Sequence, residues 1–290
     1  MISQENKIIH GLWIGKKLSA MELLCIKSFI RNNHEFWLWA YDVIETQLPD
    51  KLVVKDASKI IPREKVFCYR HSNQFGHGKG SYAGFSDIFR YKLLYEYGGW
   101  WVDMDVVCLK PFDFNEPYIF RTHHDFAMVG NMMKCPPRSE LMKLCFDRAV
   151  HLVDENNRDW NLPIKILNDT INELQLNNYI KDFSNQDSWL IIRKMLYKDY
   201  AVPESWYALH LVNEEWRRNR INKNAIPYKS YIGKLLKTYG LLLPSPGTQR
   251  FKNLLRVVII RISLQQIPGL INKYFWKFVR VFKKEKTKRP

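Results

Sequence analysis

The first part of the chain shows two patterns of apolar and polar residues. The segments KIIHGLWIG (7–15) and FWLWAYD (36–42) are short, apolar and rich in residues that favour strands. Between them, in 21–33, apolar residues recur every three to four positions, which is the period of a helix with one buried face. This order of strand, helix and strand predicts helices packed on a mostly parallel sheet.

The same alternation continues beyond this unit. Segment 81–97 has apolar residues at helical spacing and is followed by Gly98-Gly99, a pair that ends helices. Four more segments are predicted as strand, strand, helix and helix in that order: 100–109, 125–135, 139–153 and 162–176. We therefore predict an α/β fold whose ligand site lies at the carboxyl ends of the strands.

Length and cysteine content limit the class of protein. With 290 residues, 46% of them hydrophobic, the chain can bury one sizeable core. Its five cysteines are scattered and include no C-x-x-C pair, which favours buried thiols in a reducing compartment. The N-terminus lacks the pattern of a secretory signal, and no segment has the roughly 18 uncharged apolar residues of a membrane span. We expect a cytoplasmic protein, either free or attached to a membrane from one side.

Two aspartates, Asp103 and Asp105, interrupt the apolar run at 100–109. In a strand, residues two apart point to the same face, so both carboxylates would lie together and Met104 would point the other way. Such a pair suits a hard divalent cation, Mg²⁺ or Mn²⁺, which prefers oxygen ligands and often also holds substrate phosphates. Alone, the D-x-D pattern is a weak signal, and two solvated acids at a strand end are an equally good interpretation.

A phosphatase is a second chemical interpretation of the same residues. Asp103 to Val107 fits D-x-D-x-[TV], which resembles the nucleophile motif of haloacid-dehalogenase-type phosphatases. That fold needs a later acidic pair for Mg²⁺, and neither Asp-Asp nor Gly-Asp-x-x-x-Asp occurs after residue 105. The phosphatase interpretation is therefore disfavoured.

The helix before the aspartates distinguishes these interpretations. Residues 85–113, FSDIFRYKLLYEYGGWWVDMDVVCLKPFD, resemble the sugar-binding D-x-D region of family 32 glycosyltransferases, which include initiating mannosyltransferases and bacterial capsule and O-antigen enzymes. They are also similar to the catalytic core of the large glucosylating bacterial toxins. The shared residues, in matching order and spacing, are Ser86, Asp87, Arg90, Gly98, Gly99, Asp103 and Asp105.

Two other segments resemble the family more loosely. The first strand contains Trp13, which the resemblance places on or beside the nucleotide base. YALHLVNEEW at 207–216 is similar to the late His-Leu-x-Asn-x-x-Trp element that closes the site. One departure is Leu162-Pro163, where many relatives have Gly-Pro, and it leaves the acceptor-side loop unassigned.

The resemblance implies a GT-A-type nucleotide-binding fold and a metal-dependent hexosyltransferase with a UDP- or GDP-sugar donor. Asp105 would hold Mn²⁺ or Mg²⁺ against the diphosphate, and Asp103 would reach the ribose or the metal through water. Arg90 would contact the phosphates or the sugar, and Asp87 would accept a hydrogen bond from a sugar hydroxyl. Ser86 belongs to the same donor-binding motif. Without the motif, Asp87 and Arg90 would be an ordinary surface pair three residues apart.

The late element supplies the remaining candidates. His210 or Asn213 would be a third protein ligand of the cation, although a lone histidine in this position is more often structural. Trp216 would either close over the sugar or pack in the core. The family implies retention of anomeric configuration, and we assign no catalytic base because the departing phosphate can accept the proton. The loop at 123–125, His-His-Asp, either lines the acceptor cleft or is solvated.

Positive charge is concentrated at the C-terminus. The net charge is +16, of which +11 falls in residues 250–290. Residues 251–284 interleave basic and apolar side chains, and 271–284 have the aromatic, cationic pattern of a helix that lies in a membrane interface. Nucleic-acid binding and docking on the catalytic domain are the competing interpretations, but no nucleic-acid module is recognised.

Together these patterns predict two parts. PSPG at 244–247 indicates a boundary between a glycosyltransferase domain at 1–243 and a basic, amphipathic, membrane-associating tail at 244–290. The enzyme would sit on the cytoplasmic face of a membrane and add a hexose to a glycan acceptor, such as a surface polysaccharide on a lipid carrier. The alternative from another class is a non-catalytic membrane- or nucleic-acid-binding protein with an incidental D-x-D.

Overall fold

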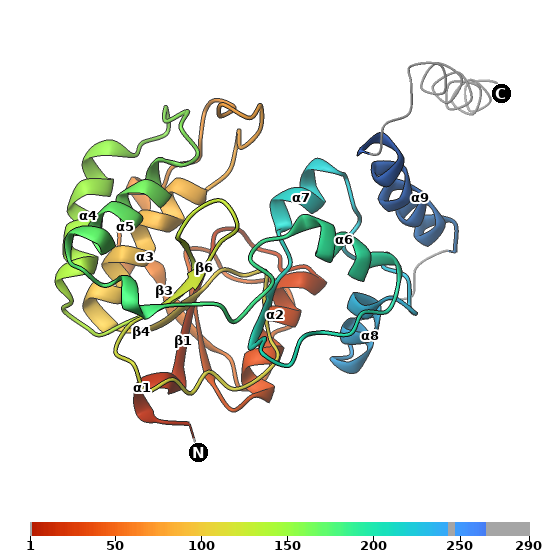
Figure 1. The fold of residues 1–290 in the computed structure, drawn as a ribbon, viewed down its shortest axis with the longest axis horizontal. Helices are drawn as coiled ribbons and strands as arrows, with labels where there is room; N and C mark the ends of the chain where they lie inside the picture. The colour runs from red at the N-terminus through yellow and green to blue at the C-terminus, as the bar shows by residue number, and fades with distance from the viewer. Residues whose placement is uncertain (1, 243–246, 265–290) are drawn as a thin grey trace.

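A seven-stranded sheet organises the molecule (Figure 1). The computed structural model describes residues 2–242 and 247–264, with side chains as far as residue 255. In these residues the sheet has the order β3-β2-β1-β4-β7-β6-β8, and β5 pairs with β9 in a separate antiparallel ladder. The strands are β1 Ile8–Trp13, β2 Glu35–Ala40, β3 Val53–Asp56, β4 Gly99–Val102, β5 Val106–Cys108, β6 Ile119–Thr122, β7 Met128–Cys135, β8 Ile180–Lys181 and β9 Ala208–His210.

The strand directions confirm the predicted fold class. β1 pairs parallel with β2 and β4, β2 with β3, and β6 with β8. Among the described strands of this sheet, only β7 is antiparallel to its neighbours, β4 and β6. The protein is therefore an α/β protein with a mostly parallel sheet, as the alternation of strands and helices predicts.

Helices cover both faces of the sheet. α3, α4 and α5 form one core with β4 and β7, and α2 packs on the opposite face (Figure 1). A third core joins α2, β5 and β9 to α6 and α8. The described α-helices are α1 Gln4–Lys7, α2 Ala20–Arg31, α3 Ala83–Tyr97, α4 Glu140–Leu152, α5 Leu162–Glu173, α6 Trp189–Tyr197, α7 Asn213–Arg218, α8 Tyr231–Thr238 and α9 Gly247–Leu264.

Local signals explain where the two helices nearest the site begin and end. α2 starts with a capping box, in which Ser19 Oγ accepts the N–H of Met21 and Glu22 Oε2 accepts the N–H of Ser19. α3 ends at Gly98, as predicted, where φ is +64°. A side chain at this glycine would also lie 2.5 Å from the Pro137 ring. Gly98 thus turns the chain sharply from α3 into β4.

The prediction of one strand over 100–109 is wrong. The chain leaves the large sheet after Val102 and enters the small ladder at Val106, so that Asp103-Met104-Asp105 forms a turn. The N–H of Val106 donates to the carbonyl oxygen of Asp103 at 3.1 Å, which closes this turn. The apolar run appeared continuous because β4 and β5 are both buried, although they belong to different sheets.

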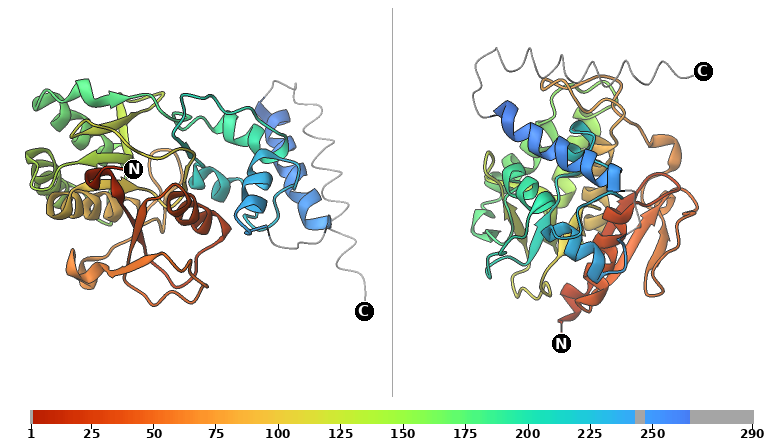
Figure 2. Two further views of the ribbon diagram at one scale, coloured as in Figure 1. Left: turned by 90° about the horizontal axis from the view of Figure 1, so that it is seen from below. Right: turned by 90° about the vertical axis from the view of Figure 1, so that its right-hand side faces the viewer.

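The first part of the C-terminal region docks on the protein body. α9 lies beside α6 and α8 at one end of the molecule (Figure 2). Asn253 is buried, and its Nδ2 donates to the carbonyl oxygens of Asn222 and Ala225, both at 2.8 Å. The guanidinium of Arg250 lies 3.5 Å from the centre of the Tyr228 ring. This supports the docked interpretation for the start of α9.

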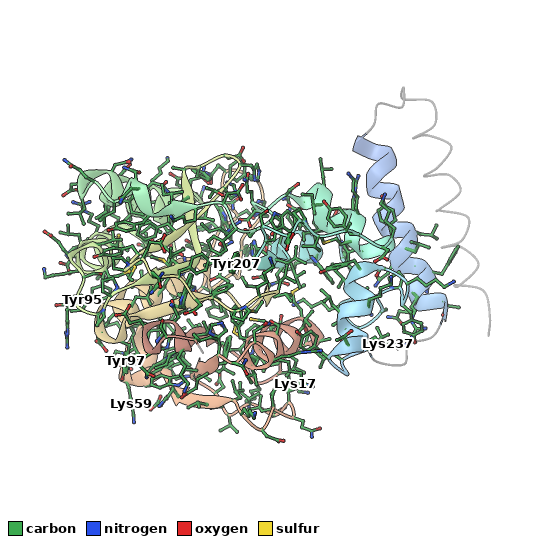
Figure 3. The ribbon with its side chains drawn as sticks, turned by 60° about the horizontal axis from the view of Figure 1, so that its bottom comes forward. Lys17, Lys59, Tyr95, Tyr97, Tyr207 and Lys237 are labelled. Atoms are coloured by element: carbon green, nitrogen blue, oxygen red, sulfur yellow. The ribbon has the colours of Figure 1, made fainter. Side chains whose placement is uncertain are left out.

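Other predictions about the tail fall on residues outside the described part. The predicted boundary between residues 243 and 244 and the predicted interfacial segment at 271–284 both fall on residues that are not described. In the described ranges, none of the helices combines the length and apolarity needed to cross a bilayer. On the body, Lys17, Lys59 and Lys237 are exposed on different elements, so their charges are spread over the surface (Figure 3).

Candidate active site

A cavity of about 980 Å³ lies at the carboxyl ends of β1 and β4, where the fold class predicts a ligand site. β1 contributes its last two residues, Leu12 and Trp13, and β4 leads directly into the D-x-D turn. α3 and the loop after β9 form further walls. The structure brings together all of the predicted site residues except Trp216: Trp13, Ser86, Asp87, Arg90, Asp103, Asp105, His210 and Asn213.

The D-x-D turn lies at the cavity wall, and its methionine also packs in the core. Asp103, Met104 and Asp105 all line the cavity, but Met104 is only 8% exposed and also packs among the residues between the sheet and α2. Asp103 Oδ1 accepts hydrogen bonds from Trp101 Nε1 at 2.8 Å and from Arg90 Nη2 at 2.9 Å. The two carboxylates therefore lie together at the cavity, as expected, but Met104 also reaches its wall, because a turn and not a strand holds the three residues.

Arg90 connects the helix to the turn. Its Nη1 lies 2.9 Å from Asp87 Oδ1 and its Nη2 lies 2.9 Å from Asp103 Oδ1, so one guanidinium bridges two carboxylates. Arg90 is 5% exposed, and its guanidinium lies 5.1 Å from the centre of the Trp101 ring. This pair is thus not a solvated surface pair. Burial raises the pKa of Asp87 to about 6, against the lowering effect of Arg90.

Gly130 on β7 makes room for this guanidinium. A Cβ atom at this position would lie 2.3 Å from Arg90 Nη1 and 3.2 Å from Leu167 Cδ2. We expect Gly130→Ala to push the guanidinium from its place between the two aspartates and to lower turnover about 100-fold, the effect of misplacing a group by about 1 Å. Overpacking should also reduce stability by about 1–3 kcal/mol.

Gly247→Ala is the matched control for this change. No atom lies within 4 Å of the position of its added Cβ. Steady-state rates and melting temperatures of both variants test the prediction. A folded Gly130→Ala protein with wild-type turnover would show that the position of Arg90 does not matter.

His210 lies between two carboxylates. Its Nε2 is 3.1 Å from Asp105 Oδ2, and its Nδ1 is 2.5 Å from Asp187 Oδ1. Burial alone would lower the pKa of His210, but the two carboxylates raise it to about 10. The imidazolium in turn holds the pKa of Asp105 and of Asp187 below the usual range, although burial opposes this. In the absence of a cation, His210 is therefore protonated at neutral pH.

Asp187 and its supporting residues were missed by the sequence analysis. Arg121 is completely buried, and its Nη2 lies 2.7 Å from Asp187 Oδ1. Asn131 Nδ2 lies 3.3 Å from Asp187 Oδ2 and 3.1 Å from His210 Nδ1. Gln186 and Asp187 both have left-handed backbone, with φ of +48° and +61°. A single aspartate in a polar loop has no periodicity or motif that would reveal this role.

Asn213 lines the cavity, and its backbone N–H also contacts the D-x-D turn. Its N–H donates to Asp105 Oδ2 at 2.7 Å, at the first residue of α7. Val212, immediately before it, has left-handed backbone with φ of +56°. Asp105 therefore accepts a backbone hydrogen bond at the start of α7 and lies beside His210 at the same time, which links the D-x-D turn to the late element.

The prediction that Trp216 contacts the donor is not met. Its side chain is 2% exposed, does not line the cavity, and packs in the core that contains α6 and α8. Its Nε1 donates to the carbonyl oxygen of Leu211 at 2.7 Å. Trp216 thus holds the turn between β9 and α7, which corresponds to the packing alternative.

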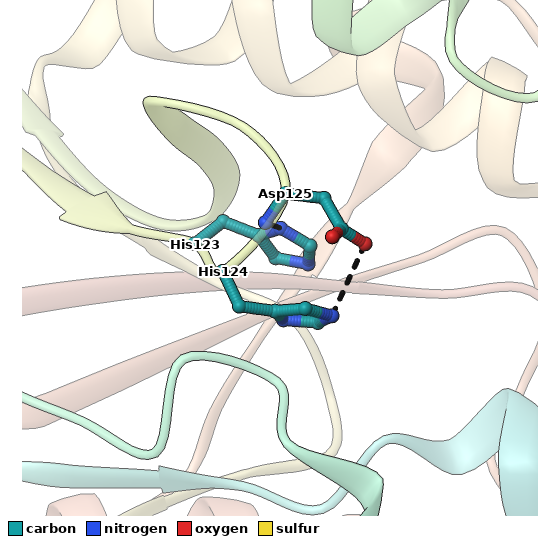
Figure 4. A group of neighbouring side chains, drawn as sticks. All are labelled: His123, His124 and Asp125. Carbon is teal, nitrogen blue, oxygen red and sulfur yellow. Dashed lines mark hydrogen bonds and ion pairs between the residues drawn. The ribbon is translucent and has the colours of Figure 1, made fainter.

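The loop after β6 forms another wall of the cavity. His123, His124 and Asp125 project from it side by side, with the two imidazoles stacked 4.2 Å apart (Figure 4). Within the described residues they form a group whose possible metal-ligating atoms lie within 4.8 Å of one another. His123 Nε2 lies 3.5 Å from Asp187 Oδ2, so the loop also contacts the His210 network.

Comparison with known proteins adds the chemical class. Residues 19–123 match the family model described as "Glycosyltransferase sugar-binding region containing DXD motif". A search of curated proteins found no match. Among solved structures, "PaToxG Glycosyltransferase" is similar with 16% identity and a TM-score of 0.43, covering 58% of this chain and 68% of that chain. A transferase mutant in which two cysteines are replaced by serine is similar with 9% identity and a TM-score of 0.36, covering 60% of this chain and 86% of that chain.

Part of the cavity wall lies in the segment that matches a glycosyltransferase sugar-binding region. The matched region contains the α3 motif and both aspartates of the turn, which together form one wall of the cavity. The predicted resemblance to D-x-D glycosyltransferases is confirmed over residues 19–123, which match a glycosyltransferase sugar-binding region that contains the D-x-D motif. The alternative of a non-catalytic protein with an incidental D-x-D is not supported.

Proposed function

We propose that the protein transfers a hexose from a nucleotide sugar to a glycan acceptor, with Mn²⁺ or Mg²⁺ bound at the D-x-D turn. The observation that carries this proposal is the arrangement of Asp103, Asp105 and His210 around one end of the cavity, with Arg90 beside them. The family model supports the sugar-binding role of the same segment.

The residues at the turn fit a divalent cation. Asp105 Oδ2 and His210 Nε2 are an oxygen and a nitrogen donor that face each other at 3.1 Å. Both hydrogen bonds that the described side chains make to Asp103 end on Oδ1, and this carboxylate has a second oxygen. A cation held by Asp105 and His210, with Asp103 as a direct or water-mediated partner, would neutralise negative charge on the diphosphate leaving group.

Arg90 and Asp87 are proposed to bind the rest of the donor. Within the described residues, the buried Nε of Arg90 has no hydrogen-bond partner, which leaves a donor for a phosphate or sugar oxygen. Asp87 can accept from a sugar hydroxyl. Trp13 lines the same cavity and has a buried Nε1 that is also unpaired among the described residues, so we place the base beside it, and Ser86 nearby.

The stereochemistry and the acceptor are also proposals. We infer retention of configuration from the family resemblance, with the departing phosphate as proton acceptor and no protein base assigned. A lipid-linked glycan acceptor on the cytoplasmic face of a membrane is supported by the basic, aromatic composition of residues 251–284. Asn253 docks the start of α9 on the body of the enzyme, where α9 contacts α6.

Metal affinity is expected to rise with pH. The pKa of His210 is about 10 without a cation, so a cation that binds Nε2 must displace a proton at any lower pH. The apparent association constant for Mn²⁺ should therefore increase about tenfold per pH unit between roughly pH 6 and 9. Calorimetry in buffers of different ionisation enthalpy should detect about one proton released. Proton-free binding would remove His210 from the ligand set.

The test of the proposed function is release of nucleoside diphosphate. Purified full-length protein is incubated with a panel of UDP- and GDP-sugars and Mn²⁺, with and without a chelator. We expect slow hydrolysis of one donor, and none when the cation is removed. Hydrolysis that is unaffected by the chelator would contradict the proposed role of the cation.

A further inference from the structure

A second cavity of about 650 Å³ lies next to the active-site cavity. His124 and Trp189 line both, so the two cavities meet at these side chains. The second cavity is formed by the loop that leads from β8 to α6, the first turn of α6, and Trp206. None of the residues proposed to bind the nucleotide sugar lines it. A ligand that extends out of the active site past His124 would enter this cavity.

The lining of the second cavity combines flat aromatic surfaces with polar groups. Trp189 and Trp206 are half-buried, and Leu190 is 55% exposed. Asp182 and Gln186 stand on the same wall, where Gln186 Nε2 donates to Asp182 Oδ2 at 2.7 Å. A sugar ring has apolar C–H faces and hydroxyl edges, which match aromatic rings and carboxylate or amide groups respectively. The carboxylate of Asp182 disfavours a phosphate or a nucleic acid here.

The backbone under this cavity is tied to the catalytic network. Asn185 is buried, and its side chain exchanges two hydrogen bonds of 2.9 Å with the backbone of His210. Ser184 Oγ accepts from Arg121 Nη1 at 3.1 Å, and Arg121 also pairs with Asp187. His124 Nδ1 donates to the carbonyl oxygen of Gln186 at 2.7 Å, which holds the shared wall. The second cavity is therefore held in a fixed position relative to His210.

We propose that the second cavity is a subsite for the acceptor glycan and holds the sugar next to the one that receives the hexose. The proposal rests on the proposed function, because the reacting sugar has to occupy the first cavity beside the donor. It extends the proposed function by naming the class of acceptor, an oligosaccharide of at least two sugars. Trp206, Leu190 and Asp182 would bind the second sugar. Because contacts in the second cavity are gained only by an acceptor that extends beyond the reacting sugar, the subsite makes the enzyme selective for chain length.

Transfer to acceptors of increasing length tests this subsite. The donor is the nucleotide sugar that the wild-type protein hydrolyses fastest, and the acceptors are an array of defined p-nitrophenyl glycosides with one, two or three sugars. We expect the wild type to prefer two-sugar over one-sugar acceptors. Trp206→Ala should lower that preference in kcat/KM about tenfold, the factor that roughly 1.4 kcal/mol of lost contact gives.

Two further variants keep the test valid if Trp206→Ala does not fold. Trp206→Phe retains a flat ring and should retain most of the length preference. Leu190→Ala should lower it about threefold. The matched control for Leu190→Ala is Leu152→Ala. Leu152 lies on α4, is 57% exposed and lines neither cavity, so its replacement should leave the length preference unchanged.

The possible outcomes separate this inference from the proposed function. Equal use of short and long acceptors by the wild type, including use of none, would overturn the subsite while donor hydrolysis continued to support the transferase. A length preference that Leu190→Ala and Trp206→Ala leave unchanged would also overturn it. Absence of cation-dependent donor hydrolysis in the wild type would instead remove the proposed function on which the subsite depends.

Discussion

Asp105→Asn is expected to lower transferase activity at least about 1,000-fold. Asp105 is the residue through which the D-x-D turn meets both His210 and the start of α7. Loss of its charge would weaken the proposed cation site, and a cation in this role contributes several kcal/mol to stabilisation of a leaving group. At about 1.4 kcal/mol per tenfold, roughly 4 kcal/mol corresponds to the expected loss.

The fold should largely survive this change. An amide oxygen can still accept the N–H of Asn213, so we expect a stability loss of no more than about 1–2 kcal/mol. The control is Asp199→Asn, an exposed acid whose Oδ2 pairs with Lys234 on α8. Donor hydrolysis and circular dichroism separate catalysis from folding. Near-normal turnover of a folded Asp105→Asn protein would rule out the cation site as described.

Asp187→Asn is expected to weaken Mn²⁺ binding about 10- to 100-fold. Asp187 is not placed as a metal ligand; it holds His210 Nδ1 at 2.5 Å, so that Nε2 faces Asp105. Carboxylates that orient metal-binding histidines in this way commonly affect metal affinity by such factors. Calorimetric or electron-paramagnetic titration of Mn²⁺ measures this effect without relying on turnover.

A comparison of two substitutions separates positioning from folding. Asn at 187 keeps an acceptor for His210 or Arg121, whereas Asp187→Ala leaves the buried guanidinium of Arg121 without this carboxylate. The alanine variant should therefore lose about 3–5 kcal/mol of stability. If Asp187→Asn lowers the melting temperature but leaves the Mn²⁺ affinity unchanged, Asp187 is structural only.

The sequence predicted the part of the site that is local in the chain. The α3 motif and the D-x-D turn lie within 20 residues, and one helix followed by one glycine turn brings Asp87, Arg90 and Asp103 together. Their spacing along the chain therefore predicts most of the geometry of this part of the site. The break between β4 and β5 was missed because both segments are buried and apolar, and only their pairing partners distinguish them.

The long-range part of the site could not be predicted in the same way. Asp187, Arg121 and Asn131 come from a loop and two separate strands, and the antiparallel placement of β7 between β4 and β6 brings them to His210. Each is a single polar residue in its segment, and contacts across a sheet leave no periodic signal. Trp216 illustrates the reverse case, since its position in a recognisable motif suggested a ligand contact although the side chain is in the core.

Thermal stabilisation by nucleotide sugars tests the central claim most directly. Full-length wild type and Asp105→Asn are heated with a panel of UDP- and GDP-sugars, each with Mn²⁺ or with a chelator. Ligand at about 100 times its Kd stabilises a folded protein by about 2.7 kcal/mol, which corresponds to roughly 5–10 °C for a domain of this size. We predict such a rise for the wild type with one class of donor, only when Mn²⁺ is present, and its loss in Asp105→Asn. A rise of equal size with the chelator, or in the variant, would contradict a cation-dependent donor site at the D-x-D turn.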